Sequence, residues 1–348
     1  MTKLAKTPHA RKAPAVTLKS LASYLGLTAG TVSSVLNNSP ASRSIPEQTR
    51  DRIFKAASQF NYRPNFLARS LRVQRSFTVG VIAEEIGDPY GATVISGIEA
   101  TLRKNNYLFL TVVHRHDEHL LRSYSQLLLT RGVEGIITID TSIDHEPTLP
   151  IVAIAGHQRV PNVTNIILDH RRAARVVLQH LYDLGHRQIA FFRGPSFSSD
   201  SVPRWSAIQE VAAELNLPIY PELVFQLEDP PNSSESGCLP AKTLLASKRP
   251  FTALFAYNDT SAVGAMAVLH DAGLSVPYDI SVVGFDDIAI ASFSTPSLTT
   301  VRQPLFEMGT VAAKTLLDRI EDRAPFIPEI ALAPELIVRK STCPARPL

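Results

Sequence analysis

Cysteine is scarce in this chain, which has only Cys238 and Cys343 among its 348 residues. Two distant cysteines cannot build the disulfide framework of a small secreted domain, and they suit a reducing compartment. Long apolar runs are also missing, because none approaches the roughly 20 residues that a membrane-spanning helix needs. The cations near the N-terminus are not followed by an apolar segment, so we expect no export signal. Together these absences predict a soluble cytoplasmic protein.

Acidic residues are rare in the first part of the chain. Residues 1–76 contain 2 Asp or Glu against 13 Lys or Arg, a net charge of +11, whereas the remaining residues carry a net charge of −8. A charge run is often only a solvated surface. Here several cations lie beside predicted helices, so neutralisation of a phosphate backbone is the better interpretation. The first fifteen residues mix cations and prolines without periodicity, which predicts a disordered basic arm over residues 1–15.

Residues that could carry catalysis are few and lack partners. The sequence has no Gly-x-Gly-x-x-Gly loop and no nucleophile beside a base, and the pair Glu84 and Glu85 stands alone. Residues 114–119 bring together three histidines and two carboxylates, which allows a metal-binding interpretation. Their place between a strand and a helix, with an arginine among them, favours a solvated loop or a cleft rim. We therefore expect no enzyme, no cofactor and no metal site.

Residues 17–37 have the pattern of a helix, a tight turn and a second helix. Thr17 is placed to cap the first helix, and Gly26 ends it because glycine adopts the left-handed turn conformation easily. Thr28 is placed to cap the second helix. The apolar stripe of the first helix consists of Leu18, Leu21, Ala22 and Leu25. This pattern predicts a helix-turn-helix, although an amphipathic pair of helices also fits a larger all-helical module.

The second helix is expected to bury Val32, Val35 and Leu36. Its outward residues are then Ala29, Gly30, Thr31, Ser33, Ser34 and Asn37. Such small and polar side chains suit base edges and phosphates in a major groove.

A third helix is predicted from Pro46, with a core-facing stripe made of Ile53, Phe54, Ala56, Ala57 and Phe60. Three small helices then form a compact DNA-binding headpiece over residues 16–63. The stretch from Asn61 to Arg72 contains helix-forming residues behind Pro64, but it is too short and too polar to be stable alone. We expect this stretch to be helical only when a partner holds it, and we assign residues 64–76 to a hinge helix and linker.

From Phe77 onward, short apolar strands alternate with helical stretches, which predicts a parallel α/β architecture. The expected strands are 78–83, 107–113, 135–139, 151–155, 188–192, 253–257 and 281–285. The expected helices are 90–104, 120–131, 170–184, 203–215, 260–272 and 305–320. Residues 77–348 are long enough for two such sheets, and polar residues after strand ends would line a crevice between them.

The chain resembles the lactose/galactose repressor (LacI/GalR) family of bacterial transcription regulators. The resemblance rests on Thr-Val-Ser-x-Val-Leu-Asn at 31–37, Tyr-x-Pro-Asn-x-x-Ala-Arg-Ser-Leu at 62–71, Val-Gly-Phe-Asp-Asp at 283–287 and Leu-Thr-Thr-Val-Arg-Gln at 298–303. It implies a hinge helix from Asn65 to Leu71 that folds on operator DNA and inserts Leu71 between base pairs. The residues expected to contact DNA are Thr17, Leu18, Thr28, Ala29, Gly30, Thr31, Ser33, Ser34, Asn37, Asn65, Ala68, Arg69 and Leu71.

The resemblance also implies two Rossmann-like subdomains of the periplasmic-binding-protein type, with a ligand cleft between them. The chain is expected to cross between them near Pro161, Phe293 and Glu321. The N-subdomain would hold residues 77–161 and 293–321, and the C-subdomain residues 162–292 and 322–340. The residues expected to bind the effector are Asp88, Tyr90, His157, Arg204, Asn258 and Asp286. For Asp259 a helix cap is the favoured role.

Two departures from the family pattern affect the expected partners. Ser34 stands where many members place a large polar or basic residue, so the operator is expected to differ from the common half-site. Ala155 and Gly156 stand where members often place an acidic residue, so a lactose-like ligand cannot be assumed. The sequence predicts a homodimeric regulator, and a repressor in particular, on a pseudo-palindromic operator, controlled by a small sugar-like effector, that is, a sugar or a related metabolite. The alternative is a periplasmic-type solute-binding protein without a regulatory role.

Overall fold

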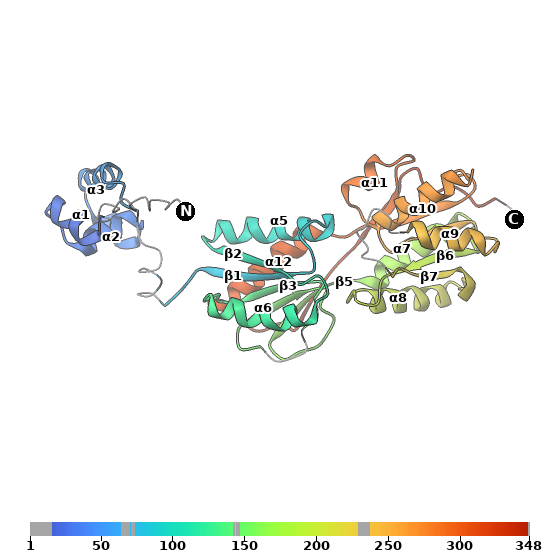
Figure 1. Cartoon of the computed structure of the whole chain (residues 1–348), viewed down its shortest axis with the longest axis horizontal. Coiled ribbons are helices and arrows are strands. Elements are labelled where there is room, and N and C mark those ends of the chain that lie inside the picture. The colour runs from blue at the N-terminus through green and yellow to red at the C-terminus, as the bar shows by residue number, and fades with distance from the viewer. Residues whose placement is uncertain are drawn as a thin grey trace, which may run out of the picture. The chain divides into compact units, whose positions relative to one another are not determined.

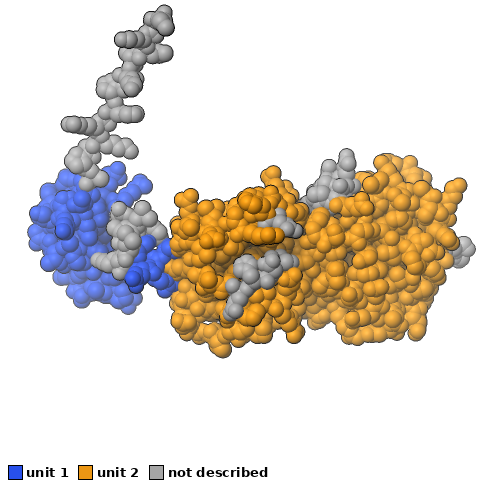
Figure 2. Space-filling model, turned by 60° about the horizontal axis from the view of Figure 1, so that its bottom comes forward, with its two compact units in different colours: residues 1–76 blue, residues 77–348 orange. Residues whose placement is uncertain are grey.

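The computed structural model describes residues 16–63, 70, 74–141, 143, 147–228 and 237–346. The predicted basic arm and the predicted hinge contacts Asn65, Ala68, Arg69 and Leu71 lie outside these residues. The chain divides into two compact units, residues 1–76 and residues 77–348 (Figure 2). Among the described helices, none has the length and apolar character needed to cross a membrane.

The first unit is a small helical headpiece. Its described elements are α1 (Leu18–Leu25), α2 (Ala29–Leu36), the 3₁₀ helix η1 (Pro40–Ser44) and α3 (Glu47–Gln59). Thr17 begins α1 in a capping box with Ser20, and Gly26 ends it with φ 65°. The three helices share one apolar core, in which Leu21, Val32 and Ile53 are buried. The predicted helix-turn-helix is therefore present in the fold.

One residue of the predicted core stripe in α3 is misplaced. Phe54 was expected inside, but half of its surface (50%) is exposed. The buried positions of α3 are Ile53, Ala56 and Ala57, and Phe60 packs against the same core. These positions recur at steps of three or four residues, whereas Phe54 lies one position, or about 100°, away from Ile53.

The second unit contains two six-stranded sheets (Figure 1). The first has the order β11-β5-β4-β3-β1-β2, and every neighbouring pair is parallel. The second has the order β12-β10-β9-β8-β6-β7, parallel except for the antiparallel pair of β10 and β12. We call the half built on the first sheet lobe 1 (77–168 and 305–332) and the half built on the second lobe 2 (170–302 and 335–346).

The strands of lobe 1 are β1 (Thr78–Ala83), β2 (Leu108–Val113), β3 (Ile136–Ile139), β4 (Ile151–Ile154), β5 (Val163–Leu168) and β11 (Glu329–Leu332), and its helices are α5 (Pro89–Lys104), α6 (Glu118–Thr130) and α12 (Leu305–Ile320). The strands of lobe 2 are β6 (Ile189–Arg193), β7 (Val224–Gln226), β8 (Ala253–Phe255), β9 (Ser281–Asp286), β10 (Thr299–Arg302) and β12 (Glu335–Ile337). Its helices are α7 (His170–Asp183), α8 (Ser201–Glu214), α9 (Cys238–Ala246), α10 (Asp259–Asp271), α11 (Ala289–Phe293) and the 3₁₀ helix η2 (Pro221–Leu223).

The three crossings between the lobes lie later in the chain than predicted. The expected crossings near Pro161, Phe293 and Glu321 are wrong, because three strands were not anticipated. β5 completes the sheet of lobe 1 between β4 and β11, so the first crossing comes at Asp169. β10 still belongs to lobe 2, which places the second crossing at residues 303–304, and β11 returns to lobe 1 and delays the third to residues 333–334.

Helices cover both faces of each sheet. In lobe 1, α5 and α12 pack on one face and α6 on the other (Figure 1). In lobe 2, α9 and α10 cover one face and α7 and α8 the other. Glycines let α5 and α12 approach closely, since a Cβ on Gly97 would come within 2.1 Å of the Phe306 carbonyl oxygen.

The carboxyl ends of the parallel strands in both sheets open toward a shared cleft. This is the position where ligands usually bind in such folds.

Candidate DNA-binding surface and ligand cleft

The exposed surface of the headpiece includes most residues expected to contact DNA. Thr17, Thr28 and Gly30 are exposed. Leu18, Ala29, Thr31, Ser34 and Asn37 are half-buried. The hydroxyl of Thr28 accepts a hydrogen bond from the Thr31 amide at 3.1 Å, which begins α2 beside the turn. Two basic residues of the headpiece are also exposed, Lys19 in α1 and Arg43 in η1.

Ser33 does not belong to that surface. It was expected to point outward, but only 8% of it is exposed. Its carbonyl oxygen and its hydroxyl receive hydrogen bonds from Nδ2 of Asn37 at 2.8 and 3.2 Å. Because α2 contacts α1, η1 and α3, its buried face is wider than the stripe of Val32, Val35 and Leu36.

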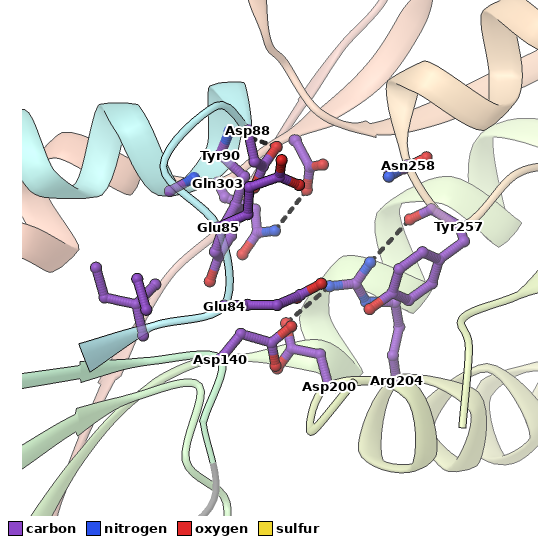
Figure 3. A pocket seen from close by; sticks show the side chains of 14 residues that line it. Glu84, Glu85, Asp88, Tyr90, Asp140, Asp200, Arg204, Tyr257, Asn258 and Gln303 are labelled. Carbon is purple, nitrogen blue, oxygen red and sulfur yellow. Dashed lines mark hydrogen bonds and ion pairs between the residues drawn. The ribbon is translucent and has the colours of Figure 1, made fainter. Parts of the chain in front are cut away.

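A polar cleft lies between the lobes at the strand ends, with an empty volume of about 560 Å³ that includes open solvent at its mouth (Figure 3). Five of the six predicted effector-binding residues line it: Asp88, Tyr90, Arg204, Asn258 and Asp286. The sixth, His157, is not among the lining residues. Charged and polar lining residues that were not predicted as effector contacts are Glu84, Glu85, Asp140, Asp200, Tyr257 and Gln303.

Two lining residues also begin helices. Asp88 accepts hydrogen bonds from the amides of Tyr90 and Gly91, both at 3.1 Å, and so caps α5. Asn258 caps α10 by accepting from the Ser261 amide at 2.9 Å. For these residues the capping role and the place in the cleft coexist.

The predicted cap of α10 is one residue away from the observed one. Asp259 does not cap, since Asn258 precedes it in that position. Asp259 instead accepts hydrogen bonds from the Thr300 hydroxyl at 2.5 Å and the Ile288 amide at 2.9 Å, and so ties together the segments after β9 and in β10. Burial raises the pKa of Asp259 to about 7.

Arg204 is held by protein groups at both terminal nitrogens and on the face of its guanidinium, whereas its buried Nε has no hydrogen-bond partner among the described residues. Nη2 donates to Asp200 at 2.8 Å, and Nη1 donates to the Tyr257 carbonyl oxygen at 2.8 Å. The guanidinium also stacks on the ring of Phe285 at 3.8 Å. Only 6% of Arg204 is exposed. Its charge is therefore largely committed to the wall of the cleft.

Asp200 is the centre of a buried polar network. It also accepts hydrogen bonds from Nε2 of His170, at 3.1 Å, and from Nε2 of His157. Burial alone would raise the pKa of Asp200, but His170, the hydrogen bonds from both histidines and the charge of Arg204 hold it well below its ordinary value. Asp200 and the two histidines could together hold a metal ion. In this structure Asp200 already has a positively charged partner in Arg204.

The lobes are joined beside this network. Asp140, which follows β3 in lobe 1, accepts hydrogen bonds from the amide of Ser199 at 3.0 Å and the hydroxyl of Ser198 at 3.1 Å in lobe 2. The Ser199 hydroxyl also donates to the carbonyl oxygen of Ala155 in lobe 1. His157 reaches Asp200 across the same boundary. The cleft is thus bordered by hydrogen bonds that depend on the separation of the lobes.

The opposite part of the cleft is acidic. Asp286, at the end of β9, accepts from Nε2 of Gln303 at 2.7 Å. Burial raises the pKa of Asp286 well above its ordinary value, against the opposing charge of Arg204. Burial, together with the charges of Asp140, Asp88 and Glu85, raises the pKa of Glu84 to about 8.

The histidine-rich segment after β2 lies at the rim of this acidic part. His116 contacts Glu84, and Nε2 of His114 lies 2.9 Å from the Thr141 hydroxyl. Asp117 caps α6 by accepting from the His119 amide at 2.8 Å. These contacts fit the predicted cleft rim.

The positions of three lining residues that the sequence analysis did not predict are consistent with simple sequence rules. Asp140 comes directly after a predicted strand, and Gln303 follows β10. Asp200 precedes Arg204 by four residues, the spacing that brings side chains together on a helix. Together the lining residues offer charges and hydrogen-bonding groups on both lobes, an arrangement that suits the binding of a small polar molecule.

Comparisons with known proteins agree with both units. Residues 17–65 match the family model of bacterial regulatory proteins of the lacI family, and residues 178–342 match that of a periplasmic binding protein-like domain. The HTH-type transcriptional repressor PurR of Haemophilus influenzae is 30% identical over 335 residues, which cover 93% of this chain and 98% of PurR. The ribose operon repressor of the same organism is 28% identical, with 93% and 98% covered.

Solved structures lead to the same family. A crystal structure of the Lac repressor dimer bound to operator and the anti-inducer ONPF has a TM-score of 0.84 at 26% identity, and the match covers 95% of this chain and 100% of that chain. A complex of the transcriptional regulator CelR with cellobiose has a TM-score of 0.69 at 26% identity, with 94% and 99% covered. The chain belongs to the LacI family of bacterial regulatory proteins and is a DNA-binding transcriptional regulator.

Proposed function

We propose that the protein is a cytoplasmic transcriptional repressor whose binding to operator DNA is controlled by a small molecule in the cleft between lobes 1 and 2. The observation that carries this proposal is the presence, in one chain, of a helix-turn-helix headpiece and a polar cleft at the strand ends. The names of its relatives PurR and the ribose operon repressor support the repressor role. The protein acts by binding rather than by catalysis.

The repressor works as a homodimer on a pseudo-palindromic operator. The similar Lac repressor is a dimer on its operator, and two-fold protein symmetry matches two half-sites. The exposed part of α2, with Gly30, Thr31 and Ser34, faces base edges in the major groove. The segment from Asn65 to Leu71 enters the minor groove, where Leu71 acts as an apolar wedge.

Control follows from the hydrogen bonds between the lobes. A ligand that contacts Asp88 or Tyr90 in lobe 1 and Asp286 in lobe 2 favours one separation of the lobes. That lobe arrangement sets the separation of the two hinge segments in the dimer, and so decides whether residues 65–71 can become helical on DNA. A coupling free energy of roughly 1–3 kcal/mol is enough for a clear regulatory response.

Selection of DNA from a random library by the purified full-length protein, with and without small molecules, tests this function. We expect enrichment of a two-fold symmetric sequence and a change in its affinity when a ligand binds. Retention of ligand binding without enrichment of any symmetric sequence would favour the alternative solute-binding protein, which shares the two-lobed body but needs no headpiece.

A further inference from the structure

We infer that the molecule bound in this cleft carries a protonated amine, placed among the carboxylates of Glu84, Glu85 and Asp286. This inference rests on the proposed role of the cleft as the effector site, and it narrows the chemical class of the effector. The lining residues include six carboxylates, those of Glu84, Glu85, Asp88, Asp140, Asp200 and Asp286. Among the described lining residues, Arg204 is the single Lys or Arg.

Arg204 is already committed to protein partners. Its two terminal nitrogens donate to Asp200 and to the Tyr257 carbonyl oxygen, and its face covers Phe285. Nε of Arg204 has no hydrogen-bond partner among the described residues, so an anionic ligand could meet one free N–H group there, but it would approach five carboxylates besides Asp200. Such a ligand is disfavoured, because like charges repel more strongly beside the protein interior than in bulk water.

The six carboxylates are not equivalent. Asp88 accepts two backbone amides, Asp140 accepts from Ser198 and Ser199, and Asp200 binds Arg204 and two histidines. Glu84, Glu85 and Asp286 are the other three. Figure 3 shows the labelled Glu84 and Glu85 on the lobe 1 side of the cleft, where Glu84 extends toward Arg204 and Glu85 lies nearer to Gln303, the hydrogen-bond partner of Asp286. These three carboxylates form the acidic pocket of the cleft. His116 contacts Glu84 and Gln303 donates to Asp286, but none of the three forms an ion pair with a lysine or arginine in the part of the chain that the structure describes.

The side chain of Gln303, in the same pocket, indicates that the ligand carries a hydrogen-bond donor. Gln303 is buried, with 4% of its surface exposed, and its Nε2 donates to Asp286. Its Oε1 has no hydrogen-bond partner among the described residues. The Tyr90 hydroxyl, also buried, likewise lacks one there. A buried acceptor without a partner is costly, so Oε1 of Gln303 calls for an N–H or O–H group from the bound molecule.

The raised pKa values of two carboxylates in this pocket agree with a place for a bound cation. Burial and the neighbouring carboxylates raise the pKa of Glu84 to about 8, and burial raises the pKa of Asp286 well above its ordinary value. An ammonium group favours the ionised form of both carboxylates and supplies three N–H donors at one point. A neutral polyol also supplies donors but leaves Glu84 largely protonated near pH 7, whereas an ammonium group gains a charged partner when Glu84 ionises.

Amino sugars and aliphatic polyamines both carry such an ammonium group. Pairs of ligands that differ in an amine or a hydroxyl group distinguish these two classes. Calorimetry on the full-length protein near pH 7 would compare glucosamine with glucose, galactosamine with galactose, and putrescine with 1,4-butanediol. We expect the amine of at least one pair to bind about tenfold or more tightly than its neutral counterpart. Preference within a sugar pair identifies an amino sugar, and preference within the third pair identifies a polyamine.

Variants connect this preference to the pocket. Glu84→Gln should reduce the preference for the amine to about threefold or less, and Asp286→Asn gives an independent loss should the first variant fold poorly. Glu222→Gln, in η2 on the surface of lobe 2, is the matched control and should keep the full preference.

Two results would overturn the inference: equal or tighter binding of the neutral member in every pair that binds, or no binding of any amine at about 10 mM. Neither result affects the DNA selection described above. Failure of that selection would reject the proposed repressor while leaving the amine preference measurable.

Discussion

At the scale of single residues, Glu84 shows how the cleft alters titration. Its pKa is raised from 4.5 to about 8. Burial is the largest cause, and the charges of Asp140, Asp88 and Glu85 add to it. Between these pH values the folded protein retains a proton that the unfolded chain has released. The contribution of Glu84 to stability therefore falls as pH rises from about 4.5 to about 8.

Replacing Glu84 by glutamine should remove this pH dependence. Near pH 8.5 the variant is expected to melt a few degrees above the parent protein, since about 1 kcal/mol raises the midpoint of a domain this size by roughly 2–4 °C. Near pH 5 the two should melt together, because Glu84 is then protonated in the folded state. Burial lowers the pKa of the neighbouring His116, so His116 is neutral at the higher pH and glutamine can keep a hydrogen bond to it.

Thermal melting at the two pH values checks this, with Glu85→Gln as the exposed neighbouring control. A variant that melts below the parent protein near pH 8.5 would show that Glu84 stabilises the fold as a carboxylate.

Asp200 gives the opposite case, a carboxylate that the fold needs in its charged form. Asp200→Asn removes the negative partner of the buried Arg204. Removing one partner of a buried ion pair lowers the free energy of unfolding by about 3–5 kcal/mol in proteins. We expect the melting midpoint of residues 77–348 to fall by on the order of 10 °C. Glu214→Gln is the matched comparison, because Glu214 pairs with Arg171 and Arg175 on the surface and should cost less than about 1 kcal/mol.

Calorimetric scans of both variants provide the measurement. Similar small losses for Asp200→Asn and Glu214→Gln would mean that Arg204 and the two histidines find other partners.

The sequence predicted the cleft residues from polar residues after strand ends and, for Arg204, from the family resemblance. Asp88 and Asp286 were found because polar residues follow parallel strands. His157 also follows a strand, but it turns toward Asp200 and does not line the cleft. Asp140 obeys the same rule and was overlooked, and the commitment of Arg204 to Asp200 depends on packing that spacing alone does not show.

At the scale of elements, seven strands were predicted and β5, β7, β10, β11 and β12 were not. β1 (Thr78–Ala83) and α12 (Leu305–Ile320) have the predicted bounds, because β1 is a continuous apolar run and α12 has apolar residues at helical spacing. β7, β11 and β12 have three or four residues each and are stabilised by pairing with strands distant in the sequence. The unrecognised β5 mattered more, because its omission shifted the first lobe crossing to Pro161.

Two glycines of the headpiece should respond with opposite sign to alanine. Gly26 ends α1 with φ 65° and has no atom within 4 Å of an added Cβ, so Gly26→Ala carries only the strain of the left-handed backbone, about 1 kcal/mol. Gly30 lies inside α2, and its added Cβ would meet the Thr28 hydroxyl at an ordinary 3.7 Å. Gly30→Ala should therefore stabilise α2 by roughly 0.5–1 kcal/mol.

Amide hydrogen exchange in α1 and α2 of the full-length protein measures both effects. About 1 kcal/mol corresponds to a roughly fivefold change in the exchange rate, faster for Gly26→Ala and slower for Gly30→Ala. A change of the same sign in both variants would contradict the assigned backbone conformations.

At the scale of the whole molecule, regulation requires that the lobes and the headpiece respond to one another. Within residues 77–348 the lobes meet through the three chain crossings and through the contacts of Asp140, Ala155 and His157 with residues 198–200. Contacts of this kind depend on the separation of the lobes. Under the proposed function, a ligand in the cleft therefore biases an equilibrium between lobe arrangements in which these contacts are made or weakened.

Ser199→Ala tests this coupling without altering a residue that lines the cleft. The variant loses the contacts of the Ser199 hydroxyl with Asp140 and Ala155. It keeps the hydrogen bond that the backbone amide of residue 199 donates to Asp140. Removing contacts that belong to one lobe arrangement should change operator affinity unequally with and without saturating ligand, by a ratio of roughly 3- to 30-fold. Titration of operator DNA under both conditions measures that ratio, with Ser196→Ala in the same loop as the exposed control. Equal changes under both conditions would place these contacts outside the regulatory equilibrium, because a contact that biases neither arrangement cannot transmit the presence of a ligand.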